Sequence, residues 1–470
     1  MNHPDCKEPA RLQRAVEDEQ AVDVMTAFPL KKKEVQTMFY KARSKETGNM
    51  WDVWLVHHDE TYYLYSLCAT GQSWDNFSMA RSPDGVHWEE IGPVLAKDEG
   101  VTWMGTGSTW RNPVPGGKPA FQINYSCWKG PRQTIFFAQS DDLVHWIKCG
   151  PTHEFVQDER WYEPNGRWDC IWTIARPGGG LYGYWTATPK PQTGGQFGFG
   201  ESSDGIAWKA MEPPKVSGVG GGEVGAVEKI GDRYVMLFGT NGHMETLVAD
   251  TPQGPFTVLT RNRILLGGHT YFARFFPSPS GLLVCHHSIA RDGQVFLGLL
   301  KGTNLDAQGT FRLTWWPGNE AMKHKSVAVN PPAAGVAGPI AMLGRKLDAS
   351  AGFVLEGTLQ LPKPLGAPRG LYVEHGKRAG TAILFNADGR AELGSVGAEG
   401  AGFKPEKAAD REIRLGAPAR FRLVLKGVLM EVYLDDFLIE CYSLPAPATG
   451  RIGLIPGNQR SSVGTLKAWT

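Results

Sequence analysis

Three carboxylates occupy positions in the sequence where an acid is unexpected. Asp52 lies in "NMWDVWLVHH", Asp169 in "NGRWDCIWTI" and Glu223 in "GVGGGEVGAVEKI", and each stands where a loop gives way to an apolar, strand-like run. Strands seldom contain Asp, because its side chain competes for backbone hydrogen bonds and is unfavourable to bury. One such acid alone is most simply an exposed residue at a strand end. Three acids in one matching context favour a functional cluster.

Converging carboxylates can break a bond at an anomeric carbon. One ionised carboxylate attacks the carbon, a second acid with a raised pKa protonates the departing oxygen, and a third anion stabilises the oxocarbenium-like charge. Glu223 has the longer side chain and Gly neighbours, which suit an acid/base, whereas Asp52 suits the nucleophile and Asp169 the stabiliser. Trp side chains near these acids could stack on sugar rings, although Trp also fills the space between sheets. These are Trp51, Trp54, Trp103 and Trp168.

A short phrase recurs through the first part of the chain and indicates the elements that carry the acids. "ARSPDGVHWEE" (80–90), "AQSDDLVHWIK" (138–148) and "GESSDGIAWKA" (200–210) each have Ser, then Asp-Gly or Asp-Leu, then Trp, with the Trp residues 58 and 62 positions apart. A weaker copy, "ADTPQGPFTV" (249–258), follows. Asp-Gly between strand-like runs signals a hairpin. We expect the Trp after each turn to pack between neighbouring repeats.

Repeats of about 60 residues with four strands each are typical of propeller blades. Residues 35–320 hold about five such repeats, so the sequence predicts an all-β, five-bladed propeller there rather than an array of β-sandwiches. A small propeller brings the inner strand of each blade to one axis, and side chains at one end of these strands converge on a funnel. The three acids, 117 and then 54 residues apart, fit the first, third and fourth blades.

The remaining segments differ in amino-acid composition and hydrophobic pattern. Residues 321–345 are rich in Ala, Gly and Pro and indicate a linker. Residues 346–470 alternate between apolar and polar positions with frequent turns, which predicts a separate β-sandwich domain. Residues 1–34 are an N-terminal extension that could contain a short helix.

Composition excludes several classes of partner. Lys plus Arg total 49 and Asp plus Glu 48, and no basic run stands out, so we expect neither nucleic acid nor a membrane as a partner. No stretch approaches the length of a transmembrane helix. The N-terminus is charged and does not resemble a signal peptide, which predicts a cytoplasmic protein, or a secreted or periplasmic one if a leader has been removed. Nothing indicates a cofactor or the oligomeric state.

The cysteines and paired histidines do not indicate a metal. The seven Cys are scattered without a C-x-x-C pair, which is typical of reduced, mostly buried thiols. "VHHDE" (56–60) and "CHH" (285–287) contain adjacent His residues, which point to opposite faces of a strand and chelate poorly. We therefore expect no metal site.

Residues 36–470 resemble glycoside hydrolase family 32, the invertase, inulinase and levanase group, which forms a clan with family 68. "MWDVWLVHHDETYYLYSL" is similar to the segment that carries the family's W-x-N-D-P-N-G motif, and "GRWDCIWTI" stands where the family has R-D-P. "GGGEVGAVEKIGDRYVMLFG" stands where the family has E-C-P, and "MEVYLDDFLIECYSL" resembles late strands of its sandwich. The resemblance implies a five-bladed propeller followed by a β-sandwich, and a retaining glycosidase that acts on an oligosaccharide or small glycoside.

The same resemblance implies roles for individual residues. Asp52 corresponds to the nucleophile, Asp169 to the transition-state stabiliser and Glu223 to the acid/base. The residues expected to bind substrate are Trp51, Trp103, Ser108, Arg167, Trp168, His269 and Tyr271.

The sequence departs from the family around these motifs. Trp51 and Val53 flank the nucleophile in place of polar residues, and Val224 replaces the Cys after the acid/base. Trp168 separates Arg167 from Asp169, so the usual arginine contact could be displaced. A β-fructofuranoside is therefore the default substrate, and another furanoside is an alternative. Two further readings stay open: an inverting family-43-like arabinosidase or xylosidase, and a non-catalytic carbohydrate-binding propeller.

Overall fold

The computed structural model describes one compact unit, Val35–Thr470, with short gaps. The predicted extension 1–34, including Cys6, lies outside the described residues. The described ranges are 35–265, 268–305, 310–329, 339–346, 348–375, 379–397, 402–409, 411–456 and 464–470.

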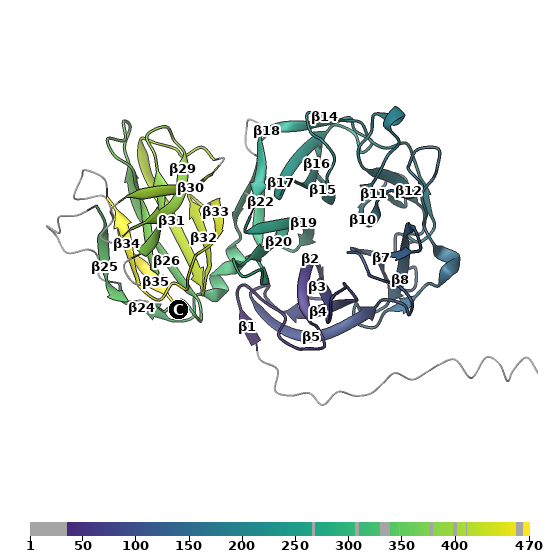
Figure 1. Ribbon diagram of the computed structural model, residues 1–470, viewed down its shortest axis with the longest axis horizontal. Coiled ribbons are helices and arrows are strands. Elements are labelled where there is room, and N and C mark those ends of the chain that lie inside the picture. Colours follow the sequence, from purple (N-terminus) through teal and green to yellow (C-terminus); the bar gives the residue numbers. More distant parts are fainter. Residues whose placement is uncertain are drawn as a thin grey trace, which may run out of the picture. The chain divides into compact units, whose positions relative to one another are not determined.

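Within these ranges the chain is built from strands in six sheets, with three short 3-10 helices, which confirms the all-β prediction (Figure 1). The first sheet has the order β1-β5-β4-β3-β2 and comprises β1 (Val35–Thr37), β2 (Asn49–His58), β3 (Thr61–Ala69), β4 (Asn76–Ser82) and β5 (His87–Ala96). The second runs β6-β7-β8-β9 and comprises β6 (Thr109–Arg111), β7 (Phe121–Lys129), β8 (Arg132–Ser140) and β9 (Ile147–Lys148). The third runs β10-β11-β12-β13 and comprises β10 (Trp168–Ala175), β11 (Leu181–Ala187), β12 (Gly198–Ser202) and β13 (Trp208–Ala210). The fourth runs β14-β18-β17-β16-β15 and comprises β14 (Val216–Ser217), β15 (Glu223–Ile230), β16 (Arg233–Thr240), β17 (His243–Ala249) and β18 (Phe256–Leu265).

The fifth sheet combines strands that follow the fourth sheet in sequence with strands from the last third of the chain. It starts with β19 (Thr270–Ser278), β20 (Gly281–Ile289), β22 (Lys301–Leu305) and β23 (Phe311–Trp315), with β21 (Val295–Leu297) paired to β20. It continues through β33 (Phe437–Ser443), β32 (Leu429–Leu434), β31 (Ala417–Lys426), β26 (Phe353–Leu361), β35 (Lys467–Trp469) and β24 (Ser326–Val327). The sixth sheet comprises β25 (Ala341–Lys346), β34 (Arg451–Ile455), β27 (Arg369–His375), β28 (Ala379–Phe385), β29 (Ala391–Val396) and β30 (Phe403–Ala409). The 3-10 helices are η1 (Pro151–His153), η2 (Pro191–Thr193) and η3 (Pro317–Met322).

The recurrent Ser-x-Asp phrase forms the turn between the two outer strands of a sheet. In the third sheet the Ser202 hydroxyl accepts the Gly205 N–H at 2.8 Å, and Asp204 Oδ1 accepts the N–H groups of Ile206 and Ala207 at 2.9 and 2.8 Å. The same bonds recur at residues 82–87 and 140–145. The residue after Asp has a left-handed backbone, with φ of +75° at Gly85 and +66° at Leu143, which explains why Gly predominates there.

These turns pack against the preceding sheet, as the sequence predicts. Trp208 contacts Trp110 of the second sheet at 6.1 Å between ring centroids, and Trp146 contacts Tyr65 of the first sheet at 6.2 Å. In the weaker fourth copy, the carbonyl of Pro252 accepts the Tyr184 hydroxyl of the third sheet at 2.7 Å. The repeats therefore stabilise one another in sequence order.

The first strands of consecutive sheets lie side by side around one centre (Figure 1). Strand β2 contacts β6 and β19, β10 contacts β7 and β15, and β15 contacts β19. Four of these strands carry the candidate site residues. Each acid identified in the sequence lies at or near the start of such a strand.

The last two sheets share a hydrophobic core. Leu355, Leu423 and Val432 of the fifth sheet pack in one buried cluster with Leu371 and Ile383 of the sixth. The predicted linker 321–345 contributes to these sheets where it is described, because β24 pairs with β35 and β25 with β34.

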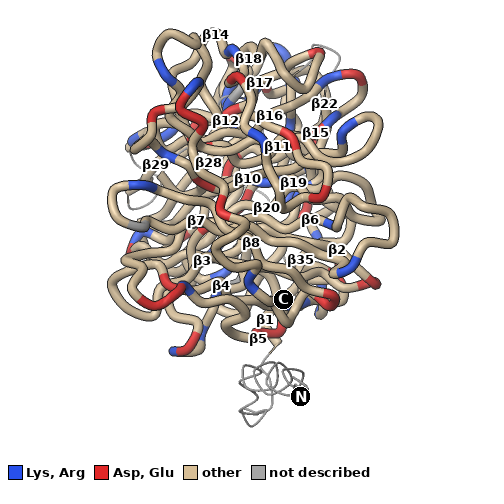
Figure 2. The backbone as a smooth tube through the Cα atoms, turned by 90° about the vertical axis from the view of Figure 1, so that its right-hand side faces the viewer, with Lys and Arg blue, Asp and Glu red and all other residues tan. Residues whose placement is uncertain are grey.

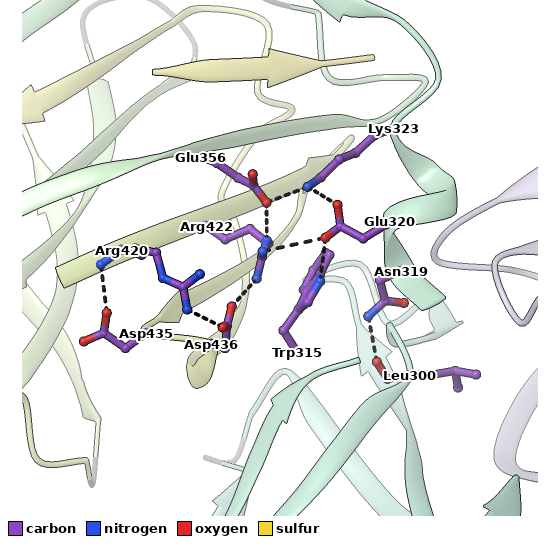
Figure 3. A network of polar contacts seen from close by, with 10 residues as sticks. All are labelled: Leu300, Trp315, Asn319, Glu320, Lys323, Glu356, Arg420, Arg422, Asp435 and Asp436. Atoms are coloured by element: carbon purple, nitrogen blue, oxygen red, sulfur yellow. Dashed lines mark hydrogen bonds and ion pairs between the residues drawn. The ribbon is translucent and has the colours of Figure 1, made fainter. Parts of the chain in front are cut away.

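A charged network lies where β23 meets the last third of the chain (Figure 3). Arg422 of β31 lies over the ring of Trp315 at 3.9 Å and binds Glu356 and Asp436 at 2.5 and 2.9 Å. Lys323, after η3, bonds to the same Glu356 at 2.6 Å. Basic and acidic residues otherwise intermingle along the chain in the view of Figure 2. The described residues contain no helix of the length and hydrophobicity needed to cross a membrane.

The six cysteines in the described ranges are free thiols, and five are buried, as expected. The paired histidines of β20 diverge, also as expected. His286 approaches Glu431 at 4.0 Å, whereas His287 lies against Trp51 with 4.6 Å between ring centroids.

The turn network predicts the effect of removing one acceptor. We expect Asp204→Ala to lower the free energy of unfolding at pH 7 by about 1–2 kcal/mol, because two N–H groups lose a charged acceptor. These hydrogen bonds lower the pKa of Asp204, so its stabilising effect is complete above the pKa of an unfolded Asp and is lost as the pH falls through the lower folded value. Urea unfolding at pH 7 and pH 3 measures both effects. Asp232→Ala, at an exposed turn, is the control, and an equal loss in both variants would contradict the prediction.

Candidate active site

Four inner strands carry a β-bulge where the candidate residues lie. Asp52 is itself the extra residue of β2, between Trp51 and Val53, and β15 has its extra residue between Val224 and Ala226. In β10 one extra residue lies between Asp169 and Trp172, and in β19 one lies between Tyr271 and Arg274. A bulge re-aims side chains, and bulges are over-represented beside active sites.

The bulges also bring two backbones unusually close. A Cβ on Gly225, the extra residue of β15, would lie 2.4 Å from the carbonyl oxygen of Ala273 in the bulge of β19. Only glycine fits there. Cys170 and Phe272 adopt left-handed φ values of +61° and +49° within the bulges of β10 and β19. Such conformations are unfavourable for residues with a side chain and persist where the surrounding structure requires them.

Asp169 is held by a chain of buried hydrogen bonds. Its Oδ1 accepts the Ser126 hydroxyl at 2.5 Å, and that hydroxyl accepts an N–H of Gln133 at 3.0 Å. The Gln133 side-chain carbonyl accepts the backbone N–H of Trp168 at 3.0 Å, which ties the network to the start of β10. Ser126 and Gln133 come from the second sheet, so the carboxylate is positioned across two sheets.

Arg167 joins two of the three acids. One of its terminal N–H groups lies 3.3 Å from Asp169 Oδ2 and 3.1 Å from Glu223 Oε1. Arg167 therefore contacts Asp169 even though Trp168 stands between them in the sequence. The hydroxyl of Tyr271 donates to Glu223 Oε2 at 3.2 Å, so both oxygens of Glu223 are bonded.

Asp52 differs from its two partners in having little hydrogen bonding. Its Oδ1 is buried and has no hydrogen-bond partner among the described residues. Burial first, and then the negative charges of Glu223 and Asp169, raise the pKa of Asp52 well above its ordinary value, while Arg274 and Arg167 oppose the rise. Burial also raises the pKa of Asp169, against the opposing effects of Arg167 and Ser126. The charges of Glu223 and Asp169 therefore reach Asp52 and oppose its ionisation.

Aromatic side chains adjoin the cluster. Trp51, next to Asp52, is partly exposed and stacks on Trp74 at 6.2 Å. Its other neighbour, His287, is fully buried, and burial lowers the pKa of this imidazole to about 3, so it is neutral. Trp51 and Tyr271 thus border the acids, and their role in binding substrate stays a prediction. Trp103 is half-buried against Trp128, in the loop before β6.

Three residues predicted to bind substrate make other contacts in the structure, and their role in binding substrate stays a prediction. Trp168 is fully buried between sheets, and its indole N–H donates to the Phe155 carbonyl at 2.9 Å. Ser108 is buried and donates to the carbonyl of Ile171, which links β6 to β10. His269 packs edge-on against Tyr442 of β33 at 5.0 Å. All three types occur in binding sites and in cores alike, and the sequence alone does not separate these cases.

Four contributors to the site escaped the sequence analysis. Ser126, Gln133 and Arg274 lie inside apolar strands with no motif around them, and Trp74 lies in a loop between strands. The signal that could have found Arg274 is an arginine in the middle of the apolar run "TYFARFF". Such a residue is almost never buried without a counter-charge.

One buried cluster has the composition of a metal site. His286, Glu431 and Cys441 bring potential ligand atoms within 4.8 Å of one another. Glu431, however, accepts Lys301 at 3.0 Å through each oxygen and the Tyr433 hydroxyl at 2.5 Å. An ammonium group already neutralises the carboxylate and would repel a cation. The cluster is therefore built around a buried ion pair between β22 and β32.

Comparisons with known proteins place this geometry in context. Neither a protein-family model nor a curated protein matches the chain. Solved structures do. A sucrose-6-phosphate hydrolase from Lactobacillus gasseri is 14% identical with a TM-score of 0.70, covering 93% of this chain and 92% of its own. An exo-inulinase from Aspergillus awamori is 11% identical with a TM-score of 0.68, covering 92% of this chain and 97% of its own. A family 32 β-fructofuranosidase from Bombyx mori is 12% identical with a TM-score of 0.66, covering 92% of this chain and 93% of its own.

The chain has the fold of glycoside hydrolase family 32. The similarity extends over nearly the whole described chain, so it includes both the inner strands that carry the acids and the last two sheets. At this level of identity it shows the fold alone, and the chemistry must be argued from the site.

The electrostatics predict that the site is a source of instability. We expect Asp52→Asn to raise the free energy of unfolding by about 1–3 kcal/mol at pH 8, because it removes a buried charge that Glu223 and Asp169 repel. The pKa of Asp52 is raised in the folded state, so the gain should be absent at low pH, where this carboxyl is protonated in both states. It should grow as the pH rises from the unfolded to the folded pKa.

Chemical unfolding of both proteins between pH 4 and pH 8 measures this gain. Asp232→Asn, on the surface, is the matched control and should be neutral throughout. A loss of stability in Asp52→Asn at pH 8 would show that attraction to Arg274 and Arg167 outweighs repulsion by the two acids, and it would contradict this prediction.

Proposed function

We propose that this protein is a retaining glycoside hydrolase that acts on a β-fructofuranoside or a related furanoside by double displacement. The observation that carries the proposal is the convergence of Asp52, Asp169 and Glu223, from three separate sheets, on one cluster that Arg167 bridges. Like-charged groups brought together in this way are unfavourable for stability and are more often catalytic than structural.

We also infer the architecture that supports this function. The sheets that begin with β2, β6, β10, β15 and β19 act as five blades of a propeller, with the acids at one end of its axis. The contacts between successive inner strands, including β19 with β2, support this inference. The shared core of the last two sheets supports a β-sandwich over residues 346–470. The domain boundaries remain those of the sequence prediction.

The proposed mechanism assigns one step to each carboxylate. Asp52 attacks the anomeric carbon and forms a glycosyl ester, while Glu223 gives its proton to the departing oxygen. In the second step Glu223 accepts a proton from water, which attacks the same carbon and releases Asp52. Asp169, fixed by Ser126, stays beside the ring and balances the positive charge that develops there.

The protonation states needed for the first step support each other. Asp52 must be ionised and Glu223 protonated. The charge on Glu223 is one of the causes that raise the pKa of Asp52, and a proton on Glu223 removes this repulsion. Loss of this repulsion makes Asp52 easier to ionise when it must attack.

The choice of substrate rests on the fold and on the altered surroundings of the acids. The solved structures of this fold include a sucrose-6-phosphate hydrolase and an exo-inulinase, which favour a fructosyl group. Trp51 and Val53 replace polar partners beside the nucleophile, so hydrogen bonds that recognise the fructosyl ring are missing. A site that lacks a partner for a buried hydroxyl loses specificity strongly. We therefore expect poor turnover of sucrose.

A sugar-release screen tests the function. Sucrose, inulin, levan, arabinan and difructose anhydrides are incubated with the protein, and released sugars are measured. On the best substrate, Asp52→Asn and Glu223→Gln should each lower kcat by about 10³-fold or more while the fold persists, because each removes a distinct chemical step. Glu228→Gln, further along the same strand as Glu223, is the matched control and should keep wild-type turnover. Wild-type kcat in Asp52→Asn would refute the nucleophile role, and a lack of release from every glycoside would favour a carbohydrate-binding protein.

Stereochemistry separates the retaining from the inverting alternative. Retention requires the two acting carboxyls about 5–5.5 Å apart, whereas inversion requires about 6.5–9.5 Å to admit a water. We expect the first product, observed by NMR within the first turnovers, to keep the anomeric configuration of the substrate. A slow substrate should also leave a glycosyl ester on Asp52, detectable by mass spectrometry. An inverted first product would instead support a family-43-like arabinosidase or xylosidase.

A further inference from the structure

Arg274 is a fully buried arginine of β19, three residues after Tyr271. One terminal N–H group donates to the Gly107 carbonyl at 2.6 Å, and another contacts the sulfur of Cys170. The guanidinium lies over the Phe272 ring at 4.5 Å, with Trp54 and Trp172 at 5.9 and 5.8 Å. Its position is therefore fixed on all sides by packing.

The bulge of β19 is what turns Arg274 toward the acids. Residues three apart on a regular strand point to opposite faces, but the extra residue between Tyr271 and Arg274 brings both to one face. Tyr271 then reaches Glu223, while Arg274 contacts Gly107 of the loop before β6 and Cys170 of β10.

The guanidinium has no carboxylate in direct contact among the described residues, and its Nε is buried without a hydrogen-bond partner. A buried charge without compensation is strongly unfavourable. Its charge acts on Asp52 through space rather than through a direct ion pair. The charged groups that act on Asp52 are Glu223 from β15, Asp169 and Arg167 at the start of β10, and Arg274 from β19.

We propose that Arg274 is the fixed counter-charge of the site, a positioning residue that makes the anionic form of Asp52 attainable without touching the substrate. This role rests on the proposed function of Asp52 as nucleophile. The hydrogen-bonded Asp169 has Ser126 and Arg167 to favour its charge, whereas Asp52 Oδ1 has no hydrogen-bond donor and depends on charge acting from a distance.

Arg167 and Arg274 thus have different roles at the site. Arg167 is partly exposed and bonds directly to Asp169 and Glu223. Arg274 is fully buried, so a substrate does not reach it and its effect persists through the reaction. A fixed charge of this kind needs no reorganisation when the ester forms and breaks.

The first experiment needs no substrate. Protein labelled with ¹³C at Asp side-chain carboxyls is titrated by NMR, and the Asp52 signal is identified by its absence in Asp52→Asn. In Arg274→Gln we expect the Asp52 midpoint to move up by at least about one pH unit, a tenfold change in proton affinity. Arg274→Lys, which keeps the charge, should move it much less. The control is Arg369→Gln. Arg369 is another buried arginine that donates to a backbone carbonyl, but it lies in β27, and its loss should leave the Asp52 midpoint unchanged.

The second experiment uses the best substrate. The acid limb of kcat/KM should shift to higher pH in Arg274→Gln by the same amount as the NMR midpoint, with kcat lowered and KM nearly unchanged. If Arg274→Gln does not fold, the double variant Asp52→Asn/Arg274→Gln should fold better, because Asp52→Asn removes the negative charge that has lost Arg274. A double variant that is no more stable than Arg274→Gln overturns the inference. An unchanged Asp52 midpoint in a folded Arg274→Gln also overturns it. A shifted midpoint in a protein that hydrolyses no glycoside would uphold the charge pairing and refute the proposed function instead.

Discussion

Side chains on a regular strand alternate between faces, and the candidate site depends on interrupting this alternation in four neighbouring strands. In β2 the interruption is Asp52 itself, which has no partner in β3 and is free to turn toward the centre. In β10 and β19 it allows residues three apart, such as Tyr271 and Arg274, to share a face. Without the bulge of β19, Tyr271 and Arg274 would point to opposite faces of the strand, and only one of them would face the acids. The packing between the sheets is what holds the bulges in place.

Once the acids are together, their mutual repulsion becomes the second constraint. The three carboxylates differ in the hydrogen bonds that offset this repulsion. Asp169 receives hydrogen bonds from Ser126 and Arg167, and Glu223 receives them from Arg167 and Tyr271. Asp52 has a buried oxygen without a donor. A carboxylate oxygen without hydrogen bonds makes the group harder to ionise. Once the group is ionised, the same lack of hydrogen bonds leaves the anion less stabilised and therefore more reactive, which suits a nucleophile. The differences among the three environments, rather than the acids alone, define which chemistry each could perform.

Within the fifth sheet, strands β19 to β23 are joined to the strands from the last third of the chain by polar as well as apolar contacts. Lys301 and Glu431 form a fully buried pair, and Arg422 is bound between Trp315 and two carboxylates. A buried pair of this kind is weak as a source of stability but strongly disfavours arrangements that separate its members. The strand pairing between β23 and β33 makes this junction continuous with the fifth sheet. The inner strand β19, which carries Tyr271 and Arg274, belongs to that same sheet.

The sequence by itself determined what depends on local patterns. The Ser-x-Asp phrases predicted the turns, because their bonds run between residues two or three apart, and the acids stood out because strands exclude them. Tertiary structure alone decided which polar residues reach the acids. Ser126 and Gln133 act across two sheets, and Arg274 faces the site through a one-residue bulge that no spacing rule foretold. Trp168, Ser108 and His269 are the reverse case: their types suit a sugar site, yet the packing of one sheet on the next buries the first two and directs the third toward Tyr442. Burial and long-range contact depend on how distant segments meet, and that information is spread over the whole chain.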